Sequence, residues 1–401
     1  MLELEEALAR ILAALPKPVG ERVPLRQAHG RILLERISAG VDLPLFDNSS
    51  VDGYAVRAAD VAQANPGSPV RLQLAGRVAA GETPPGELSA GACFRLFTGS
   101  PLPRGSDAVV MQEETRLDPG RPGEIQVLEA VRSWENVRLR GEDVKRGATL
   151  LEAGEVLTTG RLTLLAAVGV TPVNVGRRPV VGLLATGSEL KDPGEPLAPG
   201  QIYESNLAGL APLIERAGGI AKAFPVVPDA LDATRLALER ALGECDLLVT
   251  CGGVSVGEMD FIKSAFEQIR GDLQFWKVAI KPGRPFAFGR CAGRCLFGLP
   301  GNPVSALVTF LLLVRPALLR WSGAAATSLP ASPGLLAEPL HNAGSRRHFM
   351  RVLVDAAGNV RSAGFQAAHA LSSLASADGL VDVPPHTTLP PGTTVPVLRW
   401  E

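Results

Sequence analysis

The sequence has almost no net charge. Its 401 residues include 40 Lys and Arg and 41 Asp and Glu, so the formal net charge is −1. This balance offers no electrostatic basis for non-specific binding to nucleic acid or to an anionic membrane. Any charged ligand must therefore be recognised by local clusters of residues.

Cysteine and histidine are scarce, with five of each, and they are not spaced as in metal sites. Cys291 and Cys295 are close in sequence, but no histidine or further cysteine lies near them, so they give only a weak zinc signal. We expect reduced thiols in a cytosolic protein. The histidines share no metal-like or catalytic spacing, and no serine or cysteine nucleophile stands beside a base.

Leader and membrane-spanning patterns are also missing. The N-terminal segment carries Glu3, Glu5 and Glu6, whereas a secretory or mitochondrial leader would be basic or free of acids. Its apolar positions follow helical spacing and predict a helix up to Leu15. The longest apolar run, Val304–Val314, is shorter than the about 20 residues that a bilayer requires. We expect a soluble, cytoplasmic protein.

Glycine and proline, by contrast, are abundant. They number 43 and 33, which is above ordinary usage but below the roughly 25–30% of low-complexity chains. The hydrophobic fraction of 46% allows a core in each domain, and the length suggests roughly two to four domains. The sequence thus predicts a globular, multidomain protein that is rich in turns.

The pattern of apolar segments changes near Arg177. Before it, short β-branched segments separated by turn residues predict a β-rich region. After it, apolar strands alternate with helices of about 10 to 15 residues, which is typical of a doubly wound, mostly parallel sheet. Beyond Pro330–Pro333, which has the composition of a linker, further strands predict a small C-terminal β domain. The strands expected in the α/β region include Val180–Ala185, Ala221–Val227, Leu247–Cys251 and Phe275–Ala279, and the helices lie around Ser205–Ala217, Asp229–Leu242, Asp260–Ile269 and Pro303–Arg320.

Three glycine-rich loops follow predicted strands of the α/β region: Ala185–Glu189, Thr250–Asp260 and Gly298–Pro303. Glycine lets the backbone approach a phosphate closely, and the start of a helix adds favourable partial charge. One such loop is as readily an ordinary turn. Three of them at strand ends, where doubly wound sheets bind ligands, predict a nucleotide or phosphorylated ligand held without a P-loop.

Charged residues accompany these loops. Lys277 and Lys281 flank an apolar, strand-like stretch, and Arg284 follows a Pro-Gly turn; such cations are rare in strands unless exposed or paired with an anion. The carboxylates on or beside the loops are Glu189, Asp229 and Asp260. The two aspartates either cap the helices that follow them or, with the glutamate, hold Mg²⁺ beside phosphates. The residues alone leave both roles open.

Together these segments resemble the molybdopterin molybdenumtransferase family, which includes MoeA and the gephyrin E domain. The similarity runs nearly end to end and in the same order. Three of the matching segments lie before Arg177, and their residues alone would indicate ordinary turns. The matching segments are Val51–Ala55, Phe97–Gly99, Arg140–Asp143, Thr186–Leu190, Gly252–Gly257, Lys277–Pro285 and Gly298–Pro303.

The resemblance implies an enzyme that inserts molybdenum from molybdate into adenylylated molybdopterin and releases AMP, with Mg²⁺ required. It implies a homodimer, supplied by a molybdopterin adenylyltransferase, whose cleft lies between the α/β domain of one subunit and the β-rich region of the other. The domains implied are an N-terminal helix (1–23) packing on the dimer or linker region, a linker or dimerisation domain (24–45 and 145–176), a β-rich domain (46–144), an α/β molybdopterin-binding domain (177–327) and a C-terminal β domain (328–401).

Functional residues are carried over position by position. The resemblance implies Asp52, Thr98, Asp143, Glu189 and Asp260 as catalytic residues, and Glu189, Asp229 and Asp260 as metal ligands. The substrate-binding residues implied are Gly187, Ser188, Gly252, Gly253, Ser255, Gly257, Lys277, Lys281, Arg284, Pro300, Asn302, Pro303, Arg138, Arg140 and Arg351. The sequence departs from the family where Ala230 replaces a second aspartate and where Ala367-Ala368-His369 replaces a Gly/Ser-rich run.

Two other functions stay open beside this one. A molybdopterin adenylyltransferase has a similar α/β domain, but it would not need the acids of the long N-terminal region. A non-catalytic scaffold, as in the anchoring role of gephyrin, would not need Glu189, Asp260, Lys277 and Lys281 together, because packing alone does not require them.

Overall fold

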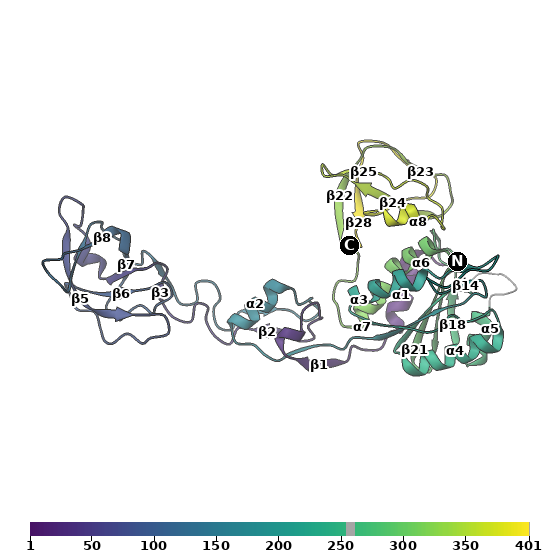
Figure 1. The fold of residues 1–401 in the computed structure, drawn as a ribbon, viewed down its shortest axis with the longest axis horizontal. Coiled ribbons are helices and arrows are strands. Elements are labelled where there is room, and N and C mark those ends of the chain that lie inside the picture. Colours follow the sequence, from purple (N-terminus) through teal and green to yellow (C-terminus); the bar gives the residue numbers. More distant parts are fainter. Residues whose placement is uncertain (254–260, 401) are drawn as a thin grey trace. The chain divides into compact units, whose positions relative to one another are not determined.

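The computed structural model describes residues 1–253 and 261–400 (Figure 1). The chain forms two compact units. The first unit comprises residues 1–35, 153–158 and 172–401, and the second comprises residues 36–152 and 159–171. Three predicted site residues, Ser255, Gly257 and Asp260, lie outside the described residues.

A six-stranded sheet in the order β16-β13-β17-β21-β20-β18 forms the centre of the first unit. The first four strands are parallel to one another, whereas β20 is antiparallel to both of its neighbours, β21 and the edge strand β18. The predicted doubly wound, mostly parallel sheet is therefore confirmed. The strands are β13 (Val180–Ala185), β16 (Ile220–Ala223), β17 (Leu247–Cys251), β18 (Asp272–Trp276), β20 (Ala287–Cys291) and β21 (Arg294–Leu299).

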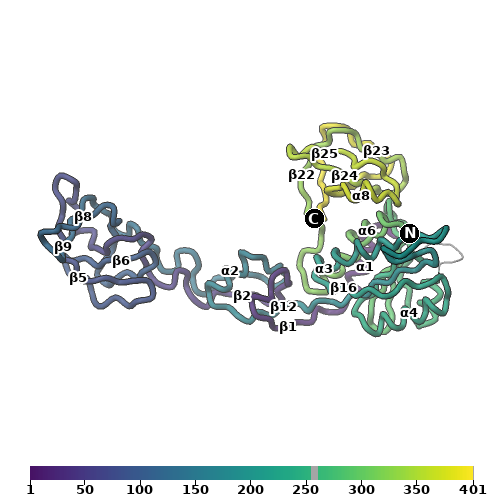
Figure 2. Tube along the Cα trace, viewed as in Figure 1, coloured from purple at the N-terminus to yellow at the C-terminus, as the bar shows by residue number. Residues whose placement is uncertain are grey.

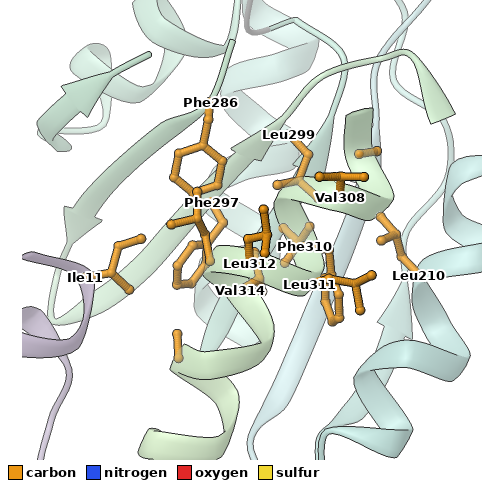
Figure 3. Close-up of a cluster of buried hydrophobic side chains, with 14 of the residues drawn as sticks. Ile11, Leu210, Phe286, Phe297, Leu299, Val308, Phe310, Leu311, Leu312 and Val314 are labelled. Atoms are coloured by element: carbon orange, nitrogen blue, oxygen red, sulfur yellow. The ribbon is translucent and has the colours of Figure 1, made fainter. Parts of the chain in front are cut away.

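Helices cover both faces of this sheet (Figure 1). Successive strand residues point to opposite faces, so Leu183 and Val249 join one core and Leu184 and Leu248 join the other. The first core contains α1 (Leu4–Ala14), α3 (Asn206–Arg216), α6 (Pro303–Thr309), the π-helical turn η4 (Phe310–Val314) and α7 (Arg315–Trp321), and the second contains α4 (Leu231–Glu244) and α5 (Ile262–Gln268). Figure 3 shows how Phe286, Phe297 and Phe310 meet in the first core.

The N-terminal helix forms where the spacing predicts it but packs elsewhere than expected. It buries Leu4, Ala7 and Ile11 in the first core, against η4 and α7. This position differs from the prediction that the helix packs on the dimer or linker region. Its apolar face instead extends the core of the α/β part.

The helical run from Pro303 to Trp321 is longer than the apolar stretch in the sequence suggests. Its 19 residues have a mean hydropathy of 1.6, which by length and composition alone would suffice to cross a membrane. In the fold, however, 72% of it is buried. Its apolar character is accounted for by its place in the core.

The segment Phe275–Ala279, predicted to be one strand, is broken in the middle. Strand β18 ends at Trp276, and Lys277 adopts a left-handed φ of 91° that turns the chain out of the sheet. The next strand, β19 (Ile280–Lys281), pairs with the C-terminal sheet instead. The two lysines therefore lie on either side of a turn.

The C-terminal sheet has the order β19-β24-β25-β22-β28-β26, and β24 also pairs with β26. It confirms the predicted small β domain. Residues 330–333, interpreted as a linker, lie largely in β22, where Ser332 pairs with Val397. The elements are β22 (Ala331–Leu336), β23 (Leu340–Asn342), β24 (Arg347–Val354), β25 (Asn359–Ser362), α8 (Leu371–Ala375), β26 (Gly379–Val383), β27 (Thr387–Leu389) and β28 (Thr394–Leu398).

The second unit contains a six-stranded sheet in the order β7-β4-β6-β5-β9-β8. Figure 2 traces the course of the chain through this unit. Buried aliphatic residues fill both faces of the sheet, which agrees with the predicted β-rich region. Its strands are β4 (Gly53–Val56), β5 (Val70–Val78), β6 (Ala92–Leu96), β7 (Ala108–Met111), β8 (Thr115–Leu117) and β9 (Glu124–Val127). Smaller elements are β2 (Ile37–Ser38), β3 (Asn48–Ser49), β10 (Val137–Arg138), β11 (Thr149–Leu151) and α2 (Thr159–Ala167).

Candidate functional site

The described parts of the three glycine-rich loops meet at one edge of the first unit's sheet. Strands β13, β17 and β21 are parallel neighbours, so the loops that follow them emerge side by side. They enclose a cavity of about 430 Å³, which we call the loop cavity. The residues that line it include Thr186, Gly187, Glu189, Asn206, Asp229, Gly252, Gly253, Pro300, Gly301 and Asn302.

The glycine pair in the second loop is required by backbone geometry. Gly252 has φ 87°, and a Cβ there would stand 2.6 Å from the carbonyl oxygen of Thr186. Gly253 has φ 63°, and a Cβ there would meet Ile262 at 2.7 Å. Only glycine fits such positions without strain. The strand ends can therefore approach each other closely and leave backbone facing the cavity.

Asp229 does not cap the helix that follows it. Helix α4 has Ala230 at its N-cap position and no side-chain cap. The Asp229 carboxylate instead accepts a hydrogen bond from the Ser188 amide at 3.0 Å, and the Asp229 amide donates to the Ser188 hydroxyl at 2.9 Å. This pair ties the first loop to the start of α4. It places Asp229 and Glu189 in the same cavity.

The structure adds site residues that the sequence did not single out. Asn206, the first residue of α3, donates from its side-chain amide to the Gly301 carbonyl at 2.8 Å. Its Oδ1 and the Thr186 hydroxyl are buried without a hydrogen-bond partner in the described part of the chain. Leu190 and Ile202, from the short strands β14 (Leu190–Lys191) and β15 (Ile202–Tyr203), supply an apolar wall. A polar residue at a predicted helix start was the only signal for Asn206.

Two buried groups beside the cavity are explained by structure rather than chemistry. Glu204 accepts hydrogen bonds from the amides of Asn206 and Leu207 and so caps α3, while burial raises its pKa. Burial likewise raises the pKa of the Cys251 thiol at the end of β17. A protonated, buried thiol is a poor nucleophile, so Cys251 serves packing.

A second cavity of about 640 Å³ adjoins the first and shares Pro285 and Asn302 with it. We call it the basic cavity. Lys281, Arg284 and Arg346 line it, and none of the described residues around it is acidic. Burial and the neighbouring Arg284 lower the pKa of Arg346. Cations gathered without a carboxylate favour an anionic ligand.

Arg351 lies in the wall of the C-terminal sheet and is fully buried. Its Nε donates to the Ser373 hydroxyl at 3.0 Å, and its Nη2 donates to the Phe365 carbonyl at 2.8 Å. Its Nη1 has no hydrogen-bond partner among the described residues. Arg351, predicted to bind substrate, is therefore placed chiefly to hold the loop that lines the basic cavity.

Two further predicted residues of the first unit are Pro303 and Lys277. Pro303 begins α6, next to Asn302 at the N-cap position. Lys277 is half-buried and is not among the described residues that line either cavity. Its amide donates to the Phe286 carbonyl at 2.8 Å, and its carbonyl accepts from the Leu2 amide at 3.3 Å. These bonds hold its left-handed backbone.

The predicted residues of the second unit form their own cluster. Both the amide and the hydroxyl of Thr98 donate to Asp52 Oδ1 at 2.7 Å. These hydrogen bonds lower the pKa of the Asp52 carboxyl, which therefore stays ionised at neutral pH. Arg95 stacks over Tyr54 beside this pair, with 5.0 Å between its Cζ and the ring centroid.

Three further predicted residues of the second unit are exposed. Arg140 pairs with Asp42 at 2.6 Å, and its amide donates to Asp47 at 2.7 Å. Arg138 lies in β10, and the Asp143 amide donates to the Leu43 carbonyl at 3.1 Å. The charged side chains of Arg138, Arg140 and Asp143 are therefore not buried by other parts of the second unit.

Three known domain families match the chain in succession. Residues 2–169 match the MoeA N-terminal region (domain I and II), residues 182–320 a probable molybdopterin binding domain, and residues 333–400 the MoeA C-terminal region (domain IV). The chain is 40% identical to the molybdopterin molybdenumtransferase of Haemophilus influenzae, covering 93% of this chain and 92% of that protein. The chain belongs to the molybdopterin molybdenumtransferase (MoeA) family. This membership makes it a transferase of molybdenum cofactor biosynthesis.

Further members of the MoeA family agree. Molybdopterin molybdenumtransferase 2 of Mycobacterium tuberculosis is 40% identical, covering 90% of each chain. The crystal structure of a molybdopterin biosynthesis MoeA protein from Pyrococcus horikoshii has a TM-score of 0.83 at 34% identity, covering 100% of this chain and 99% of that one. The MoeA fold therefore extends over the whole chain.

The loop cavity has the donor types of a magnesium site, although the described residues contain no group of three His, Cys, Asp or Glu side chains that could hold a metal by themselves. Mg²⁺ is usually held by one or two carboxylates together with substrate phosphates. Glu189 and Asp229 offer two carboxylates, and Asn206 and Thr186 offer buried oxygens without partners. The residues present therefore fit this ion.

Proposed function

We propose that this chain inserts molybdenum from molybdate into adenylylated molybdopterin, with Mg²⁺-dependent release of AMP. The observation that carries the proposal is the adjacency of two cavities of opposite character. The loop cavity contains Glu189 and Asp229, and the basic cavity contains cations only among its charged described residues. A reaction that joins a phosphorylated substrate to an oxyanion needs both kinds of site side by side.

The loop cavity is the place for the pyrophosphate of the substrate. Its backbone amides at the strand ends and the start of α6 offer partial positive charge to phosphate oxygens. Glu189 and Asp229 are the residues that would hold Mg²⁺, together with Asp260, which lies outside the described residues. When bound, the ion neutralises charge on the phosphates. The carboxylates of this chain orient that charge rather than contact molybdate, which is itself an anion.

The basic cavity is the place for molybdate. Lys281, Arg284 and Arg346 supply positive charge, and Ser305 of α6 supplies a hydroxyl. Because the cavities share Pro285 and Asn302, an oxyanion in one lies next to a pyrophosphate in the other. Such placement of two reactants is a large part of catalysis.

The proposed step exchanges one P–O bond for another. An oxygen of molybdate attacks the adenylate phosphorus, and the pyrophosphate P–O bond to molybdopterin breaks. The terminal phosphate of molybdopterin is the leaving group. The Mo–O bond of the attacking oxygen then breaks as the two dithiolene sulfurs bind the metal, so AMP keeps the oxygen from molybdate. Isotope labelling tests this order, because ¹⁸O from labelled molybdate must appear in AMP. AMP without the label would contradict it.

We also propose that the enzyme is a cytoplasmic homodimer that receives its substrate from a molybdopterin adenylyltransferase. The charged side chains of the second unit, half-buried Asp52 with exposed Asp143, Arg138 and Arg140, support a role at a subunit contact. In that arrangement the second unit of one subunit completes the cavities of its partner.

The assay that tests the proposed function uses the purified full chain with adenylylated molybdopterin, molybdate and Mg²⁺. We expect stoichiometric AMP and molybdenum incorporation. Glu189→Ala is expected to abolish both without changing the oligomeric state, because Glu189 lines the loop cavity and is not buried in a core. Glu195→Ala, on the following loop, is the matched control. Normal turnover by Glu189→Ala would refute the site assignment.

A parallel assay with ATP and non-adenylylated molybdopterin separates the two alternatives. An adenylyltransferase would consume ATP and non-adenylylated molybdopterin and release pyrophosphate. A scaffold would do neither. Both outcomes would contradict the proposal.

A further inference from the structure

An aromatic side chain stands at the mouth of the basic cavity. Phe365 is among the residues that line this cavity, yet 71% of its surface is exposed. It is the most exposed of the large hydrophobic residues in the described part of the chain. A single exposed apolar residue is ordinary on a protein surface, but Phe365 lines a cavity and is therefore placed to contact a ligand.

The loop that carries Phe365 is braced from behind. The Phe365 carbonyl accepts hydrogen bonds from Arg351 Nη2 at 2.8 Å and from the Ser373 hydroxyl at 3.0 Å. Arg351 also donates to the Ala367 carbonyl at 3.2 Å, and the Ala368 carbonyl accepts from the Val304 amide at 3.2 Å. The backbone of the ring is therefore fixed to both the C-terminal sheet and α6.

One further contact sets the ring itself. Phe365 and His369 meet edge to face, with 6.0 Å between ring centroids and 67° between ring planes. The exposure of Phe365 shows that most of the ring remains open to a ligand. A fixed, open ring loses little conformational entropy when a flat group stacks on it.

The chemistry around the ring identifies the kind of ligand. Lys281, Arg284 and Arg346 line the same cavity. Cations beside an aromatic face are the combination that binds nucleotides and other anionic heterocycles, where the ring stacks and the charges hold phosphate. Neither a free oxyanion nor an aliphatic anion would use the ring.

We propose that Phe365 is a stacking platform for a planar heterocycle of the adenylylated substrate, whose pyrophosphate extends from the mouth of the basic cavity into the adjoining loop cavity. This inference rests on the proposed function. The heterocycle is either the pterin or the adenine, since both are flat, polar rings on the same molecule. Phe365 thereby contributes to substrate selection rather than to the bond exchange.

Steady-state kinetics of three variants tests the platform. Phe365→Ala is expected to raise the KM for adenylylated molybdopterin about tenfold, within the range measured for base–aromatic stacking. The KM for molybdate and kcat are expected to stay at wild-type values. Phe365→Trp is expected to keep the wild-type KM. Phe365→Leu, which is apolar but has no aromatic face, is expected to show the same rise in KM as Phe365→Ala. Leu371→Ala, an exposed residue of nearby α8, is the control.

Equilibrium binding identifies the ring and separates this inference from the proposed function. If adenine stacks, Phe365→Ala weakens binding of AMP; if pterin stacks, it weakens binding of non-adenylylated molybdopterin and leaves AMP binding unchanged. These binding measurements do not depend on turnover, so an inactive wild-type enzyme would refute the proposed function alone.

Three results would overturn the platform itself: wild-type KM in Phe365→Leu, an equal rise in both KM values in Phe365→Ala, or dissociation of the oligomer in Phe365→Ala by sedimentation. The last would assign the ring to a subunit contact.

Discussion

At the scale of single residues, His348 is buried among cations. It is 3% exposed, its Nε2 has no hydrogen-bond partner in the described chain, and it pairs in register with Lys281. Burial, followed by the charges of Lys281, Arg351 and Arg346, lowers the pKa of His348 from 6.5 to about 4. The folded protein therefore keeps this ring neutral.

The lowered pKa of His348 predicts a loss of stability in mild acid. Below pH 6.5 the unfolded chain takes up a proton on this ring, whereas the folded chain does so only near pH 4. Its contribution is therefore present above pH 6.5 and is lost as the pH falls toward 4, by about 2 kcal/mol at pH 5. Thermal unfolding of wild type and His348→Gln at pH 7 and pH 5 checks this. An equal acid shift in both proteins would show that His348 is not the cause.

Two glycines of the loop cavity predict opposite outcomes on substitution. Gly301→Ala is sterically free, because a Cβ there meets only the Gly252 Cα at 3.7 Å. Its stability should change by less than about 0.5 kcal/mol. The new methyl group nevertheless faces the cavity, so the KM for the adenylylated substrate is expected to rise.

Gly252→Ala is expected to destabilise the fold by about 1–3 kcal/mol, since its left-handed backbone and the Thr186 carbonyl both oppose a side chain. Denaturant titration measures the change in stability, and kinetics measures the change in KM. An unchanged KM in Gly301→Ala would show that the substrate does not contact the backbone at Gly301.

At the scale of elements, the N-terminal segment supports the turn at Lys277. The Leu2 amide donates to the Lys277 carbonyl at 3.3 Å, and the Leu2 carbonyl accepts from the Ala279 amide at 2.8 Å. Left-handed backbone at a residue other than glycine costs roughly 1–3 kcal/mol and persists only where neighbours hold it. Helix α1 anchors these residues in the first core.

Leu2→Pro removes one of the two hydrogen bonds while keeping the chain length. Because the family resemblance assigns Lys277 to substrate binding, we expect a rise of about fivefold in the KM for the adenylylated substrate, equivalent to one hydrogen bond of about 1 kcal/mol. Leu2→Val keeps the amide and should behave as wild type. In a Lys277→Ala background Leu2→Pro should have no further effect, because it acts through that lysine. Additive losses in the double variant would contradict this.

The sequence predicted these elements unevenly, for physical reasons. The apolar pattern sufficed for β13 and β17, because nearly all their residues are apolar and turns flank both strands. The three loops could be located because parallel strand ends share an edge. The prediction failed at β18 because the turn at Lys277 depends on a bond to Leu2, which is distant in sequence, as well as on one to Phe286. It also missed Asn206 and Phe365, since the role of each depends on a cavity that only tertiary packing creates.

At the scale of the whole molecule, the predicted site residues fall into two separate units. Glu189, Asp229 and Lys281 belong to the first unit, and Asp52 and Thr98 belong to the second. The proposed homodimer accounts for this division if each active site takes one group from each subunit. The activity of each site would then depend on residues from both subunits.

Subunit mixing tests this arrangement. Asp52→Ala and Glu189→Ala are each expected to be inactive as homodimers. When the two are unfolded, mixed in equal amounts and refolded together, half of the dimers are mixed, and each mixed dimer has one site with both residues intact. Activity should therefore return to about a quarter of the wild-type value for random pairing in a twofold dimer. If both residues served a site within one chain, every site in the mixture would carry a substitution and no activity would return.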